Sequence, residues 1–105
     1  MTSANSDKYG RLDPMLAAIE ALVRCESPSE DIEACRSVVR LASDISTRVL
    51  GIPAQIKEIE GRPVFWWGSD APEILILAHL DTVWPHGSYS PLWEVNGDVV
   101  RGPGV

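Results

Sequence analysis

The sequence contains no long apolar run and no internal repeat, and we expect no signal peptide. No apolar stretch approaches the roughly 20 residues that are needed to cross a bilayer. The first 14 residues, MTSANSDKYGRLDP, are polar and contain no apolar core of a secretory signal. We therefore expect a cytoplasmic protein that does not contact membranes. Residues 1–11 are expected to form a flexible N-terminus, and the remainder is one small domain by length.

Positive charge is scarce in this sequence. The 105 residues include 9 basic and 15 acidic side chains, and the formal net charge is −6. A surface with this balance repels the phosphate groups of nucleic acids and of anionic lipids. The charge balance therefore argues against a nucleic-acid partner.

Cysteine is scarce as well. Cys25 and Cys35 do not form a CxxC motif, and no histidine lies near either of them. Both fall in segments that we expect to be helical. We predict that they are buried, reduced thiols.

Two amphipathic helices are predicted in the first half of the chain. Asp13, which is followed by proline, predicts the start of a helix that continues to about Arg24. Ser27 and Glu30 have the spacing of a capping box and predict the start of a longer second helix. Gly51, followed closely by a proline, predicts its end.

The pattern after the second helix is typical of strands. Residues 54–59 and 63–67 predict two strands with a turn between them. Residues 74–78 are apolar at every position, which predicts a central strand covered on both faces. Asn96 and Gly97 stand between two β-type segments and predict a hairpin.

This order of elements predicts an α/β fold, with a mixed sheet flanked by helices. Helices on both faces of such a sheet would require more than the two helices that the sequence predicts. We therefore expect the sheet and its helical layers to be incomplete in this chain.

His79 and Asp81 are the main candidates for a functional site, because they follow the apolar run directly. Ligands bind beyond the carboxyl ends of strands in open α/β sheets. Two positions apart in an extended segment, both side chains leave the same side of the backbone. The imidazole can bind zinc while the carboxylate accepts its other ring N–H. From the spacing alone, a structural histidine and an Asx turn at Asp81 are open alternatives.

The chain resembles the M20 family of metallopeptidases, the glutamate carboxypeptidase and aminoacylase group. The resemblance extends from about residue 12 to residue 105 and rests on four ordered motifs. These are S-P-S-E-D at 27–31, H-L-D-T-V at 79–83, N-G-D at 96–98 and R-G-P-G at 101–104. It implies that residues 12–105 are the N-terminal portion of a zinc-peptidase-like catalytic domain.

The resemblance also implies roles for two residues. His79 matches a ligand of one ion in a dinuclear zinc site, in which cobalt or manganese can replace zinc. Asp81 matches the carboxylate that hydrogen-bonds this histidine and is needed for activity. The remaining ligands of such enzymes lie later in their sequences, in part beyond a bridging aspartate. A single histidine cannot hold a catalytic zinc ion, which normally needs three protein ligands.

The implied parent enzyme hydrolyses peptides or N-acyl amino acids, and full-length members commonly carry a dimerisation domain. We therefore expect a homodimer for the full-length protein and little activity for this chain alone. The rest of the catalytic domain is absent from the sequence, and a second chain could supply it.

Other acidic and histidine residues are weaker candidates. His86 lies in a loop, where we expect no ligand role. Asp98 is expected to form the hairpin turn. Asp70 and Glu73 flank the predicted central strand at its far end, away from the site.

A non-catalytic binding or assembly module is an alternative function. Tryptophan is enriched at binding hot spots, and four tryptophans in a chain of 105 residues is a high number. Alternatively, these tryptophans pack against the missing part of the parent enzyme. The four residues are Trp66, Trp67, Trp84 and Trp93.

Overall fold

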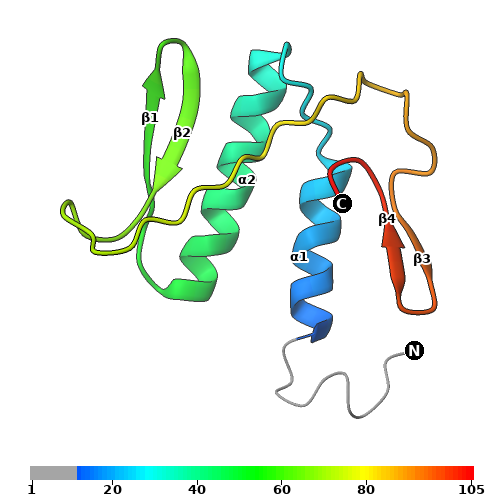
Figure 1. The fold of residues 1–105 in the computed structure, drawn as a ribbon, viewed down its shortest axis with the longest axis horizontal. Coiled ribbons are helices and arrows are strands. Elements are labelled where there is room, and N and C mark those ends of the chain that lie inside the picture. The colour runs from blue at the N-terminus through cyan, green and yellow to red at the C-terminus, as the bar shows by residue number, and fades with distance from the viewer. Residues whose placement is uncertain (1–11) are drawn as a thin grey trace.

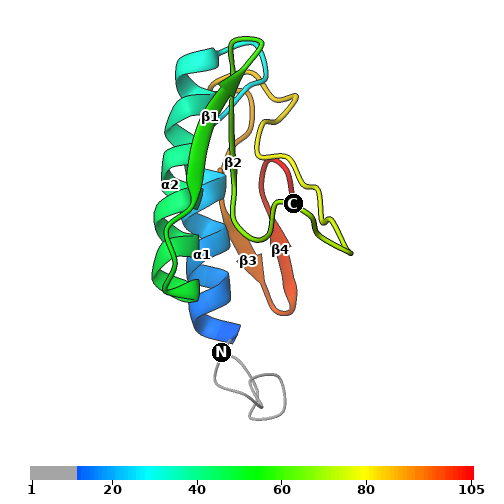
Figure 2. The ribbon, with the colours of Figure 1, turned by 90° about the vertical axis from the view of Figure 1, so that its left-hand side faces the viewer.

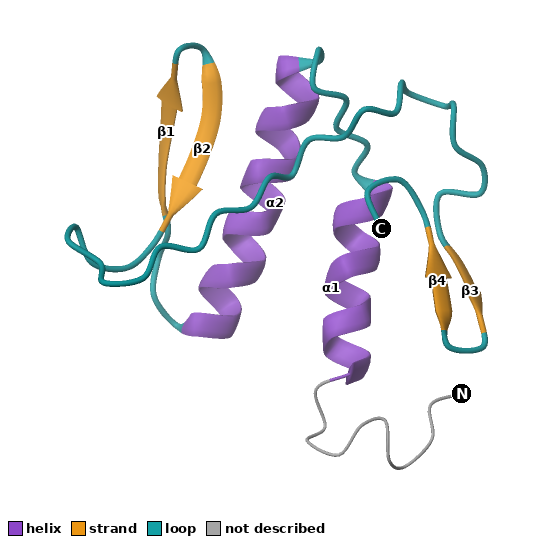
Figure 3. Ribbon diagram, in the orientation of Figure 1, coloured by secondary structure: helices purple, strands orange, loops and turns teal. Residues whose placement is uncertain are grey.

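A computed structural model describes residues 12–105, and these residues form two helices and two β-hairpins (Figures 1 and 3). In chain order these elements are α1 (Leu12–Arg24), α2 (Ile32–Leu50), β1 (Gln55–Ile59), β2 (Arg62–Trp66), β3 (Glu94–Asn96) and β4 (Val99–Arg101). The two helices run antiparallel, with the β1–β2 hairpin beside α2 and the β3–β4 hairpin beside α1 (Figure 1). In Figure 2, β2, β4 and the segment between the hairpins lie to the right of the helices. The described chain is thus a small α+β fold, which is compatible with the predicted α/β class only at a coarse level. The predicted mixed sheet does not form among residues 12–105, because both sheets there are two-stranded and antiparallel.

The core forms along the buried face of α2. Its buried apolar residues recur at the three- and four-residue spacing of a helix face, and α1 adds one residue from its last turn. This face of α2 packs against both α1 and β2. The buried apolar side chains are Val23, Cys35, Val38, Val39 and Ala42.

The ends of α2 are stabilised by a residue at each terminus. The Asp31 side chain accepts a hydrogen bond from the backbone N–H of Ala34 at 3.0 Å, which satisfies one of the free amides of the first turn. Gly51 adopts the left-handed conformation with φ 72° and ends the helix, as predicted. The predicted capping box at Ser27 was wrong. Residues 27–29 precede the helix and pair instead with residues 80–82.

Both predicted hairpins form, but the turn of the second one lies one residue later than predicted. Ile59 pairs with Arg62 in the first hairpin, and Glu60 and Gly61 both have positive φ in the two-residue turn between them. In the second hairpin Asn96 pairs with Val99, and Gly97 has φ 62° at the first turn position. Each hairpin forms its own two-stranded antiparallel sheet.

The prediction of a central strand at residues 74–78 was wrong. The segment forms no strand, and its residues 74–77 are between 69% and 88% exposed. A strand forms only where a neighbouring strand can accept its backbone hydrogen bonds. Among residues 12–105 the four strands pair within their own hairpins, so this apolar run has no strand beside it.

The expectations for the cysteines hold in part. Cys35 is buried within α2, whereas Cys25 lies just beyond α1 and is half-buried. Neither is in a disulfide. The predicted flexibility of residues 1–11 concerns a stretch outside the described residues. Within the described part of the chain, no helix is both long and apolar enough to cross a membrane.

Candidate functional site

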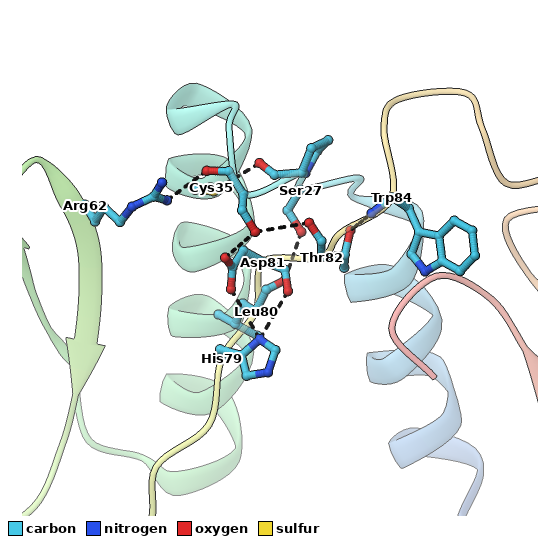
Figure 4. Close-up of polar contacts among 10 residues, drawn as sticks. Ser27, Cys35, Arg62, His79, Leu80, Asp81, Thr82 and Trp84 are labelled. Atoms are coloured by element: carbon cyan, nitrogen blue, oxygen red, sulfur yellow. Dashed lines mark hydrogen bonds and ion pairs between the residues drawn. The ribbon is translucent and has the colours of Figure 1, made fainter.

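The candidate site lies where two loops run side by side. The segment that enters α2 pairs with the segment that follows the apolar run, through a single parallel bridge between Pro28 and Thr82. Thr82 N–H donates to the Ser27 carbonyl at 2.8 Å, and Ser29 N–H donates to the Thr82 carbonyl at 3.0 Å. The Ser27 hydroxyl adds a bond to the Leu80 carbonyl at 2.9 Å (Figure 4). These bonds fix the backbone that carries Asp81.

His79 and Asp81 are in contact, as their spacing predicted. The Nδ1 atom of His79 lies 3.2 Å from Oδ1 of Asp81 and 3.2 Å from the Asp81 carbonyl oxygen (Figure 4). A carbonyl oxygen and an ionised carboxylate can only accept hydrogen bonds. Nδ1 therefore carries the hydrogen in this arrangement, and a neutral ring presents an unprotonated Nε2.

The second carboxylate oxygen of Asp81 has a partner of its own. The hydroxyl of Ser29 donates to Oδ2 of Asp81 at 2.6 Å. This bond, followed by the contact with His79, holds the pKa of the Asp81 carboxyl below its ordinary value against the opposing effect of partial burial. Asp81 is therefore ionised at neutral pH and acts as a hydrogen-bond acceptor on both sides.

The surroundings of His79 differ from those expected. We expected this histidine to follow a central strand that is covered on both faces. The side chain is instead 86% exposed, because the preceding segment is neither paired nor covered. The position of the ring therefore depends on Asp81 and not on a surrounding sheet.

A half-open cavity of about 490 Å³ lies beside the pair. It is bounded by the C-terminal end of α1, by the segment that carries His79, and by the turn at residues 103–105. Its wall includes both apolar and ionisable side chains, so it could take a small molecule with a polar end. Functional side chains in this wall are Cys25, Glu26, His79, Asp81 and Trp84.

The two cysteines near the site are unsuited to nucleophilic chemistry. Burial raises the pKa of the Cys25 thiol above its ordinary value. Burial, and then the negative charge of Asp81, raises the pKa of the Cys35 thiol in the same direction. Both groups are therefore protonated at neutral pH, and the reactive thiolate is disfavoured.

His86 lies in a separate cluster. Its Nε2 is 2.9 Å from Oδ2 of Asp31, and its Nδ1 is 3.4 Å from Oε2 of Glu26. Both ring nitrogens thus face carboxylates, which raises the pKa of the imidazole above its ordinary value. The other weaker candidate, Asp98, is in the turn between β3 and β4, as expected.

The residues present supply one ligand position and no complete metal site. Within residues 12–105, no group of three or more histidine, cysteine, aspartate or glutamate side chains could hold a metal ion. The unprotonated Nε2 of His79 suits one position on zinc or a similar ion, and Asp81 suits the role of its hydrogen-bonded partner. No reaction step can be derived from these two residues alone.

Two residues of the site were missed by the sequence analysis. Ser29 lies within the S-P-S-E-D motif, which we interpreted only as the opening of a helix. Arg62 donates from Nη1 to the Ser29 carbonyl at 2.8 Å, although its position at the start of β2 gave no indication of this contact. Because 33 residues separate these two partners, no local pattern predicts their pairing.

Comparison of the chain with protein-family models, with curated proteins and with solved structures finds no match.

Proposed function

We propose that this chain is the N-terminal portion of a metal-dependent amidohydrolase or peptidase of the M20 type. In this proposal His79 is a ligand of one ion of a dinuclear zinc site, where cobalt or manganese could replace zinc. Asp81 orients the histidine through Nδ1. The substrate is a peptide or an N-acyl amino acid, and the scissile bond is an amide.

One observation carries this proposal. The contact of Nδ1 with Asp81, at 3.2 Å, leaves Nε2 as the nitrogen with a free electron pair, and the His79 side chain lines the cavity. A histidine that binds a metal ion typically donates its other ring N–H to a carboxylate or a carbonyl oxygen. Here both kinds of acceptor meet Nδ1.

The residues that would complete the site are not in this sequence. A mixed zinc-peptidase-like sheet, in which residues 74–78 become a central strand, would need further strands and helices of the same domain. They could follow on a longer polypeptide or belong to a second chain. We therefore expect the 105-residue chain to be inactive alone and the full-length protein to be a homodimer.

The first experiment is the intact mass of every polypeptide in the purified protein, under denaturing conditions. A second species that starts near residue 106 would indicate a two-chain enzyme. Assembled material, or a longer polypeptide that contains residues 1–105, is then assayed with zinc on dipeptides and N-acyl amino acids. The isolated 105-residue chain is assayed in parallel, which tests its expected inactivity.

Substitutions test the assigned roles. His79→Ala should abolish hydrolysis and lower the bound zinc, because a direct ligand is lost. Asp81→Asn should reduce activity or metal affinity by about 10–100-fold, as is typical for partners of a ligand. His86→Gln is the control and should retain hydrolysis. Unchanged hydrolysis in His79→Ala would refute the proposal.

A second candidate function is a non-catalytic binding or assembly module. The exposed apolar residues at 74–77, together with exposed Trp67 and Trp84, favour this alternative, because large apolar patches often mark interaction sites. Trp66 and Trp93 are only partly exposed and contribute less. A stable, monodisperse, metal-free 105-residue monomer would favour the module. Obligate co-purification with a longer chain would favour the enzyme fragment.

A further inference from the structure

Ser29 is the residue behind the His79–Asp81 pair. Its hydroxyl donates to Oδ2 of Asp81 at 2.6 Å and also lies 3.2 Å from the Thr82 carbonyl oxygen. The single hydroxyl hydrogen favours the shorter bond to the charged oxygen. The contacts therefore form a chain that runs from Ser29 through the carboxylate to the imidazole.

The serine is itself held firmly by its backbone. Its N–H donates to the Thr82 carbonyl at 3.0 Å, and its carbonyl accepts from Arg62 Nη1 at 2.8 Å. The residue is partly buried, in contrast to the exposed imidazole. In this series of hydrogen bonds, Ser29 is thus held in place by the surrounding structure, whereas His79 is exposed to solvent.

Asp81 needs the fixed Ser29 to orient the ring. A carboxylate can turn about its side-chain bonds, and it offers two equivalent oxygens to any donor. The Ser29 hydroxyl occupies Oδ2, so that Oδ1 faces Nδ1 of His79. Among residues 12–105, the Ser29 hydroxyl is the group that holds Oδ2 of Asp81 in place.

We propose that Ser29 is a positioning residue that sets the tautomer of His79 through Asp81. By holding the carboxylate, it keeps the hydrogen on Nδ1 and the electron pair on Nε2, which is the form that binds a metal ion. The role of that electron pair as a ligand rests on the proposed function. Control of the tautomer does not, because it is a property of the metal-free chain.

The test is ¹⁵N NMR of the imidazole nitrogens in the complete, metal-free 105-residue chain. In the neutral imidazole the two nitrogen shifts report which nitrogen carries the hydrogen. We expect the wild-type His79 to be mainly in the Nδ1–H form. Ser29→Ala should lose this majority and shift towards Nε2–H, the form that an unconstrained imidazole prefers. Ser29→Thr keeps the hydroxyl and should restore the wild-type shifts.

Two controls make the result specific. Ser37→Ala removes another serine hydroxyl, one that donates to the Glu33 carbonyl at an exposed position of α2, and should leave His79 unchanged. Asp81→Ala removes the carboxylate acceptor and leaves only the backbone carbonyl oxygen of residue 81 near Nδ1, so it should give at least the shift of Ser29→Ala. A merely structural role of Ser29 would alter the backbone spectrum without a specific change of tautomer.

The proposal fails if Ser29→Ala keeps the Nδ1–H form while Asp81→Ala loses it. It also fails if Asp81→Ala has no effect, because the carboxylate would then not control the ring. If Ser29→Ala does not fold, the result for Ser29→Thr decides. A folded Ser29→Thr variant in which His79 is mainly in the Nε2–H form would overturn the proposal. The proposed hydrolase fails independently, by unchanged hydrolysis in His79→Ala, so the two failures are distinguishable.

Discussion

At Gly102 the backbone passes within contact distance of two neighbours. A Cβ atom built at this buried position would lie 2.5 Å from the Leu92 carbonyl oxygen and 2.7 Å from Cγ1 of Val23. Val23 belongs to the core, and the Leu92 oxygen is part of the backbone, so neither can move away freely. The glycine thus lets the turn after β4 pack on the end of α1.

We predict that Gly102→Ala destabilises the protein. Overpacking of this kind costs about 1–3 kcal/mol in the free energy of unfolding. Urea denaturation followed by circular dichroism measures the loss. Gly97→Asn is the control, because Gly97 has open space around it and asparagine tolerates its positive φ. Equal losses in both variants would contradict the explanation by close packing.

Contacts between single residues were predictable only where the two residues are close together in the sequence. The meeting of His79 with Asp81 follows from a two-residue spacing in extended backbone, and it was predicted. The bond from Ser29 to Asp81 joins residues 52 positions apart, so it depends on how the two loops dock. A serine in a loop has many possible partners, and the sequence alone does not choose among them.

At the level of elements, the start of α2 shows how two valid cap signals compete. Ser27 and Asp31 are both good N-cap residues, and each is followed by suitable helix-starting residues. Asp31 caps the helix because Ser27 is engaged by Thr82 and Leu80 on the neighbouring loop. Tertiary contacts that the sequence does not reveal thus decided between two equally good local patterns.

The cluster of His86, Asp31 and Glu26 links the loop after the candidate site to the connection between the helices. His86 approaches Asp31 at 2.9 Å and Glu26 at 3.4 Å, and Glu26 also accepts from the N–H of Gly87. The Asp31 bond, and then the Glu26 bond, raises the pKa of His86. The Asp31 carboxyl has its pKa lowered by the Ala34 N–H and then by His86.

We predict that this link stabilises the protein most in mildly acidic solution. A raised histidine pKa contributes stability that is fully present below the ordinary value of 6.5 and is lost as the pH rises through the folded value. A lowered aspartate pKa contributes stability that is present above 3.8 and is lost as the pH falls through its folded value. Both contributions are complete only between these two ordinary values.

Thermal unfolding of the wild type and His86→Gln checks this window. The difference in melting temperature should be largest at about pH 5 and should shrink at about pH 9, where the imidazole is neutral in both states. The difference between the two proteins reports the whole link, which includes the effect of His86 on the Asp31 carboxyl. A difference that does not change with pH would show that the link is not electrostatic.

At the scale of the whole molecule, the success of the hairpins and the failure of the central strand have one cause. Each hairpin carries its partner strand and its turn within about a dozen residues, so the pairing is local. The run at 74–78 has the composition of a buried strand, but a strand also requires neighbours that are distant in sequence. The composition of the run shows that it is hydrophobic. It does not show whether a partner strand is present.

This exposed run should make the isolated chain associate. The residues at 74–77 include four large aliphatic side chains, and their backbone is not paired with a strand of the described chain. Unpaired apolar segments of this kind pair readily with other chains. We predict that Ile76→Glu reduces concentration-dependent association, as measured by sedimentation velocity over a series of protein concentrations.

The matched control for this prediction is Ala71→Glu. It adds the same charge to an exposed loop position five residues earlier and leaves the apolar run intact. If net charge alone governed association, both variants would behave alike. If the apolar run governs it, only Ile76→Glu should sediment as a monomer at concentrations where the wild type does not. A wild-type chain that stays monomeric throughout would refute the prediction and would favour the binding-module alternative over the enzyme fragment.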